Sequence, residues 1–204
     1  PAWIGAAFGA LRLGAVLVPL DAQFDDDALR YVLNDSGAAA LFIPASGGER
    51  MKELVGETDT VLVELDRDWT ESAGRDDTSS GGRRDAGSPN TGTDETAVLF
   101  YTSGTTGEPK GVPLTHRNIL TEIGVVMNAD IVHAGDCVLL PLPLHHVYAF
   151  VVGLFGPMVY GAPVVFPQAL TGPQIVRATR DANVTTVVGV PRLYRALYQG
   201  IQER

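Results

Sequence analysis

Short runs of β-branched residues alternate with helical patterns along almost the whole chain. The predicted strands cover residues 15–18, 39–43, 60–65, 96–101, 137–140, 164–166 and 184–188. The predicted helices cover residues 3–13, 26–37, 49–55, 147–160, 173–182 and 192–202. Strands that alternate with helices of about ten residues indicate βαβ units. We therefore expect an α/β fold with a mostly parallel sheet.

One segment interrupts this alternation. Residues 66–95 consist mainly of Gly, Ser, Thr, Asp and Arg, and Trp69 is their one large apolar side chain. Such a composition cannot form a core. We expect a solvated loop or linker, with a recognition or regulatory loop as the alternative. The predicted organisation is a first α/β portion over residues 1–65, this polar loop over 66–95, and a second α/β portion over 96–204.

Composition excludes several classes of protein. The 204 residues are 45% hydrophobic, which suffices for a packed core. The net charge of −9 argues against nucleic-acid binding, which requires a basic surface. The single cysteine, Cys137, cannot form an internal disulfide, so we expect a reducing, cytoplasmic setting. Glycine and proline interrupt the apolar stretch 147–166, so we expect no membrane span there.

The most specific motif follows the predicted strand at residues 96–101. It comprises Tyr101, Thr102, Ser103, Gly104, Thr105, Thr106, Gly107, Glu108, Pro109, Lys110 and Gly111. Glycines let backbone N–H groups approach an anion, while hydroxyls and a lysine add further donors. Thr115 can then cap a helix that carries Ile119, Ile123 and Val126 on one face. A strand, a loop of small residues and a helix predict a phosphate-binding site.

This loop is not an ordinary P-loop. The spacing from Gly104 would require glycine at position 109 and serine or threonine after the lysine, where the chain has Pro109 and Gly111. The hydroxyl that holds magnesium in that motif is therefore missing, which argues against a GTPase or kinase-type site.

The motif from Tyr101 to Gly111 resembles the signature of the adenylate-forming superfamily, which includes acyl- and aryl-CoA synthetases. Three further parts of the chain are similar to this family: an early region made of residues 9–20 and the helix at 26–37, the motif at 142–148, and the helix start at 190–194. The resemblance covers the chain except residues 66–95. It implies part of the large N-terminal domain of an AMP-forming acyl-CoA synthetase.

The resemblance implies that the carboxylate of an acid attacks the α-phosphate of Mg·ATP and releases pyrophosphate, after which a thiol, often coenzyme A, takes the acyl group. On this basis the ATP phosphates are bound by Thr102, Ser103, Gly104, Thr105, Thr106, Gly107 and Lys110. Such donors would stabilise the charge that moves onto the leaving pyrophosphate. The resemblance assigns no certain catalytic residue to this chain.

In the motif at 142–148, the resemblance places His146 and Tyr148 beside the acyl or aryl group of the substrate. The alternative for His146 is a helix cap, and His145 is expected to pack or lie at the surface. Adjacent histidines without a carboxylate or thiol cluster do not predict a metal site. Residues 147–161 contain no acidic side chain to pair with a substrate ammonium, so an apolar acid fits better than an amino acid. We expect a fatty acid first and an aryl acid second.

Later family motifs are absent before Arg204, including the glutamate that binds Mg²⁺, the hinge, and the C-terminal domain with its lysine. We therefore expect the isolated chain to be inactive and its partners to be the rest of its N-terminal domain and a C-terminal domain. The alternative is a nucleotide- or acyl-binding module without catalysis.

Overall fold

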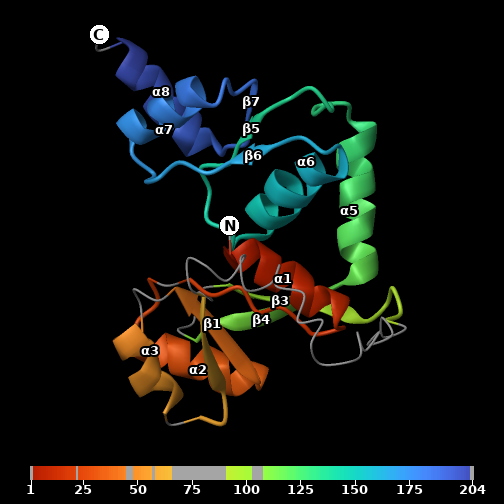
Figure 1. Cartoon of the computed structure of the whole chain (residues 1–204), viewed down its shortest axis with the longest axis vertical. Helices are drawn as coiled ribbons and strands as arrows, with labels where there is room; N and C mark the ends of the chain where they lie inside the picture. The colour runs from red at the N-terminus through yellow and green to blue at the C-terminus, as the bar shows by residue number, and fades with distance from the viewer. Residues whose placement is uncertain are drawn as a thin grey trace, which may run out of the picture. The chain divides into compact units, whose positions relative to one another are not determined.

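The computed structural model describes residues 2–21, 23–44, 48–56, 58–65, 91–102 and 108–202. The chain divides into two compact units, Pro1–His116 and Arg117–Arg204. In Figure 1 the colours from red to yellow-green belong to the first unit, and those from green to blue belong to the second. Each unit is described by itself below.

In its described residues, the first unit contains three helices and two pairs of strands. The helices are α1 (Ala2–Arg12), α2 (Asp26–Ser36) and α3 (Gly48–Val55). The strands are β1 (Ala40–Pro44), β2 (Val61–Leu65), β3 (Thr96–Thr102) and β4 (Lys110–Thr115). β1 and β2 are parallel, whereas β3 and β4 form an antiparallel hairpin. Every predicted helix and strand of residues 26–65 is therefore present.

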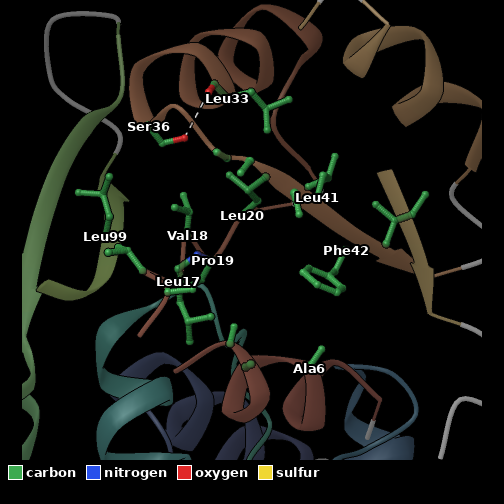
Figure 2. A pocket seen from close by; sticks show the side chains of 18 of the residues that line it. Ala6, Leu17, Val18, Pro19, Leu20, Leu33, Ser36, Leu41, Phe42 and Leu99 are labelled. Atoms are coloured by element: carbon green, nitrogen blue, oxygen red, sulfur yellow. Dashed lines mark hydrogen bonds between the residues drawn. The ribbon is translucent and has the colours of Figure 1, made fainter. Parts of the chain in front are cut away.

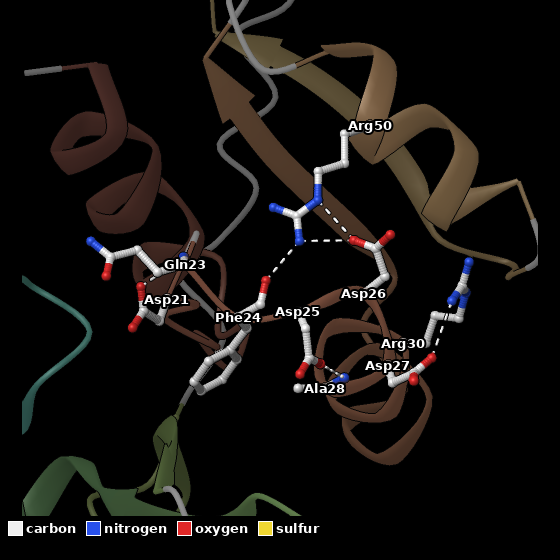
Figure 3. A network of polar contacts seen from close by, with 9 residues as sticks. All are labelled: Asp21, Gln23, Phe24, Asp25, Asp26, Asp27, Ala28, Arg30 and Arg50. Carbon is white, nitrogen blue, oxygen red and sulfur yellow. Dashed lines mark hydrogen bonds and ion pairs between the residues drawn. The ribbon is translucent and has the colours of Figure 1, made fainter.

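The start of α2 is fixed by the acidic run that the sequence places there (Figure 3). The Asp25 carboxylate accepts a hydrogen bond from the Ala28 N–H at 2.8 Å, which caps the helix. Arg50 of α3 donates to Asp26 Oδ1 at 2.8 Å and to the Phe24 carbonyl at 2.7 Å, and so joins the two helices. The helix ends at Gly37, whose φ of 60° is left-handed and suits glycine.

Alternate residues of β1 face opposite sides of its sheet. Leu41 and Ile43 are buried with Leu33 of α2 and Val55 of α3 in one apolar cluster. The opposite face carries Phe42, which is 40% exposed and borders an apolar hollow of about 890 Å³. Figure 2 shows this hollow between α1, β1 and the segment that holds the labelled residues from Leu17 to Leu20.

The second unit is organised around a small parallel sheet. Its strands are β5 (Val138–Leu139), β6 (Val164–Val165) and β7 (Thr186–Val187), with β5 in the centre. The helical elements are α5 (His116–Asn128), which starts at the unit boundary, the π-helix η2 (Ala149–Phe155), α6 (Gly156–Val159), α7 (Gly172–Asp181) and α8 (Pro191–Gln202). The predicted α/β class with parallel sheets is confirmed.

Three details differ from the sequence prediction. The predicted strand 15–18 makes a single bridge, between Leu17 and Val98, because only two backbone hydrogen bonds join it to β3. β4 was not predicted, because Gly111 and Pro113 give it little strand character. The helix predicted over residues 147–160 is present, but much of it is the π-helix η2.

Two predictions concern the chain as a whole. Most of the predicted polar loop, residues 66–90, lies outside the described residues, whereas residues 91–95 form a turn without helix or strand. No helix in the described part of the chain has both the length and the apolar character that crossing a membrane requires.

Candidate functional site

The β3–β4 hairpin carries the two ends of the predicted phosphate loop. Its last paired residues are Thr102 and Lys110, and the preceding pair is Tyr101 and Gly111. Thr102 and Lys110 are both exposed and lie opposite each other where the strands separate. Ser103, Gly104, Thr105, Thr106 and Gly107 lie outside the described residues. The structure thus brings together the first and last of the predicted phosphate-binding residues.

The apolar pattern of β3 explains why the hairpin forms where it does. Ala97, Val98 and Phe100 are buried, and Leu17 pairs with one edge of the strand while β4 pairs with the other. Among the described strands β4 pairs only with β3, so Pro113 costs no ladder hydrogen bond on a second side. The loop is therefore bounded by strands that are held on two sides at β3 and on one side at β4.

Tyr101 links the end of β3 to helix α2. Its side chain is 9% exposed, and its hydroxyl donates a hydrogen bond of 2.6 Å to Asp35 Oδ2. Burial first, and then the hydrogen bond and negative charge of Asp35, raise the pKa of the Tyr101 phenol far above its usual range. The phenol therefore stays protonated as a donor. Sequence analysis missed this contact, because no spacing rule connects residues on α2 with residues on β3.

Tyr31 lies one helical turn before Asp35 on α2. Partial burial raises the pKa of its phenol, and the charges of Asp35 and Glu108 raise it further. Glu108 is the first described residue after the loop. Tyr31 therefore lies near Glu108, and Asp35, on the same side of α2, is bonded to Tyr101.

The predicted acid-binding residues lie in the second unit, at the turn that leads into η2. His146 is exposed, its backbone N–H donates to the Pro143 carbonyl at 3.2 Å, and its ring centre lies 4.3 Å from that of His145. Tyr148 is 43% exposed. Both side chains are accessible, as substrate-lining residues must be.

Tyr194 is a neighbour of this turn that sequence analysis did not assign to the site. Partial burial raises the pKa of the Tyr148 phenol, and the nearby Tyr194 raises it further. Tyr194, on α8, donates from its hydroxyl to the Val187 carbonyl at 2.8 Å. The sequence signal that could have indicated this neighbour is that the motif at 190–194 ends in an aromatic residue.

The position of η2 depends on close packing against Leu140, the residue that follows β5. A Cβ atom at Gly153 would lie 2.5 Å from Leu140 Cδ1, and Leu140 is 1% exposed. Only glycine fits at that distance without a shift. Since π-helical turns occur often at functional sites, this geometry directly after His146 and Tyr148 is consistent with a binding role for the turn.

The described residues contain no group of three or more His, Cys, Asp or Glu side chains that could hold a metal ion. His145 and His146 are neighbours without such a cluster.

Comparison with protein families gives one match over the full length. The sequence model described as "AMP-binding enzyme" matches residues 1–204. A malonate–CoA ligase of Arabidopsis thaliana is 27% identical, with 98% of this chain and 34% of the relative covered. A feruloyl-CoA synthase of an Amycolatopsis species is 29% identical, with 97% and 38% covered. The chain thus spans little more than a third of the length of these relatives.

Solved structures share the fold. ATP-bound MatB from Rhodopseudomonas palustris superposes with a TM-score of 0.81 at 22% identity, covering 97% of this chain and 39% of that protein. A malonyl-CoA ligase in complex with methylmalonyl-CoA and AMP gives a TM-score of 0.76 at 26% identity, covering 98% and 39%. These similarities confirm the predicted fold class and its incompleteness relative to those enzymes.

Proposed function

This chain belongs to the AMP-binding enzyme family, and we propose that it is the N-terminal part of an ATP-dependent carboxylic acid–CoA ligase. The reaction joins an acid to the α-phosphate of ATP, releases pyrophosphate, and then transfers the acyl group to coenzyme A. The rest of the N-terminal domain and a C-terminal domain, together with a Mg²⁺ ligand, would come from the remainder of the protein. We expect the 204 residues alone to be inactive, and the protein to act in the cytoplasm.

The observation that carries this proposal is that Thr102 and Lys110 lie opposite each other at the loop end of the β3–β4 hairpin. A hydroxyl and an ammonium on adjacent strands present two donors to an anion, and the glycines and hydroxyls of residues 103–107 would complete the cradle. Lys110 would stabilise the charge that develops on pyrophosphate as it leaves. One such donor contributes roughly 3 kcal/mol to lowering a barrier.

The composition of the acid-binding segment supports an apolar acid. Residues 147–161 contain neither an acidic nor a basic side chain, so this segment offers no partner for a substrate ammonium or for a second carboxylate. Burial of such a charge without a partner is unfavourable. A fatty acid is the first choice and an aryl acid the second. By their names, relatives act on malonate, ferulate and long-chain fatty acids.

The experiment is carboxylate-dependent ATP–pyrophosphate exchange by the intact gene product, with fatty, aryl, amino and dicarboxylic acids in parallel. Exchange with fatty or aryl acids is the expected result. Exchange only with an amino acid or a dicarboxylic acid would contradict the proposed substrate class. If a folded protein binds ATP but exchanges with no acid, it is a binding module without catalysis.

A further inference from the structure

The Tyr101 side chain makes contacts both through its ring and through its hydroxyl. A Cβ atom at Gly111 would lie 3.4 Å from Tyr101 Cζ, so the phenol ring lies across the glycine of the facing strand. At its far end the hydroxyl bonds to Asp35 of α2. The ring is therefore held against β4 and its hydroxyl is held against α2, which limits motion of the strand at this residue.

The location of this attachment is informative. Tyr101 lies one residue before Thr102, which forms the last described pair of the hairpin with Lys110. The earlier part of β3 is already secured by the burial of Ala97, Val98 and Phe100. The hydrogen bond to Asp35 thus fixes the strand at the last residue before the phosphate loop begins.

Glu108, which follows the loop, lies near the same helix, α2. Glu108 acts electrostatically on Tyr31, and Tyr31 and Asp35 are one turn apart on α2. Residues i and i+4 of a helix lie on one face. The face of α2 that carries Tyr31 and Asp35 therefore lies near Glu108 and is bonded to Tyr101 through Asp35.

We propose that Asp35 and Tyr101 are positioning residues that hold Thr102, the next residue of β3, in the geometry that binds the phosphates of ATP. This inference rests on the proposed function, because it takes the loop to be an ATP phosphate site. Neither residue contacts ATP in this proposal. Their effect is transmitted through the backbone of β3, and small displacements of binding groups weaken both binding and catalysis.

The test compares Tyr101→Phe, Asp35→Ala and Asp35→Asn, and the double variant Tyr101→Phe/Asp35→Ala, in the intact gene product. The matched control is Thr60→Val, which also removes a hydroxyl of a buried side chain that donates to a backbone carbonyl, that of Ala38 at 2.8 Å. Each protein is measured for its equilibrium dissociation constant for ATP, its KM for ATP and for the acid in pyrophosphate exchange, and its thermal midpoint.

Tyr101→Phe and Asp35→Ala should each raise the dissociation constant and KM for ATP about tenfold, with the KM for the acid unchanged. The double variant should be no worse than either single variant, because both remove the same bond. Asp35→Asn should be milder, since its amide oxygen still accepts a hydrogen bond. Loss of a carboxylate near phosphates would alone strengthen ATP binding, so weaker binding in Asp35→Ala separates positioning from charge. Thr60→Val should leave ATP binding unchanged.

Unchanged ATP constants in Tyr101→Phe and Asp35→Ala, or effects that multiply in the double variant, would overturn the inference. A lowered thermal midpoint with unchanged ATP constants would assign the pair a structural role only and overturns it too. If Asp35→Ala fails to fold, the ATP constants of Tyr101→Phe and Asp35→Asn test the inference in its place. If the wild type binds ATP without exchange, the proposed function fails while the dissociation constants still test the positioning role. A wild type that neither binds ATP nor exchanges contradicts both.

Discussion

Thr102 and Lys110 lie on adjacent strands of one hairpin, whereas His146 and Tyr148 lie on a turn between the parallel strand β5 and a π-helix. The hairpin positions its two residues through contiguous strand pairing, with one long-range contact to Asp35. The turn in the second unit depends on how closely η2 packs against Leu140. The first region is thus held by pairing between strands that are neighbours in the sequence, and the second by the packing of a helix against a side chain of another segment.

Lys110→Ala should have the largest effect in this comparison, and the effect should be confined to the adenylation half-reaction. Loss of the ammonium is expected to slow adenylation about 100-fold, because one charged donor at a leaving group contributes on that scale. Thioester formation from supplied acyl-adenylate should change little. The measurement is the rate of each half-reaction in the intact gene product. An equal loss in both half-reactions would show that Lys110 does not act at pyrophosphate.

Gly153→Ala should affect the acid side instead. The added methyl group would overlap Leu140, which is buried and has little room to move. We expect a loss of about 1–3 kcal/mol in the free energy of unfolding and a higher KM for the acid, with the KM for ATP unchanged. Chemical denaturation and exchange kinetics measure the two effects.

The matched control is Gly124→Ala, in helix α5, where a Cβ atom would meet nothing within 4 Å. It should gain about 0.5–1 kcal/mol from the better helix former. If both glycine variants behave alike, the packing of η2 against Leu140 does not determine the geometry of the acid site.

Asp25→Ala should lower the free energy of unfolding by about 1 kcal/mol, since it removes the hydrogen bond to the Ala28 N–H that caps α2. Because α2 also carries Asp35, KM for ATP serves as a second readout and should rise slightly. Asp27→Ala, at an exposed residue of the same turn with a 3.5 Å ion pair to Arg30, is the control and should change stability by a few tenths of a kcal/mol. Equal effects in the two variants would argue against the cap.

Thr185→Val should have the smallest effect, in the second unit only. The Thr185 hydroxyl donates to Asp136 at 2.6 Å, and this bond, followed by that of the His133 N–H, lowers the pKa of the Asp136 carboxyl. Because the pKa is lowered, the ionised Asp136 carboxylate stabilises the folded state at pH values above the ordinary carboxyl range. This contribution is lost as the pH falls through the lowered pKa. In Thr185→Val the pKa of Asp136 should rise toward its ordinary value, as measured by NMR titration. If the pKa of Asp136 is the same in Thr185→Val as in the wild type, the Thr185 hydroxyl is not what lowers it.

Local signals explain what could be predicted about the fold. The acidic run at 25–27 and Gly37 marked both ends of α2, and the apolar spacing of Leu29, Val32 and Leu33 marked its buried face. β4 escaped prediction because its pairing with β3 outweighs the low strand propensity of Gly111 and Pro113. The π-helix also escaped, because its hydrogen-bond pattern has no distinct periodicity in so uniformly apolar a segment.

By itself, the sequence determined the alternation of helices and strands, the location of the loop between Thr102 and Lys110, and the absence of charged side chains from residues 147–161. These are properties of composition and short-range spacing. Only the tertiary structure decided that Thr102 faces Lys110, that Asp35 bonds to Tyr101, and that Gly153 lies against Leu140. Each of these contacts joins residues from different elements, and their distances depend on how the elements pack, which no local pattern encodes.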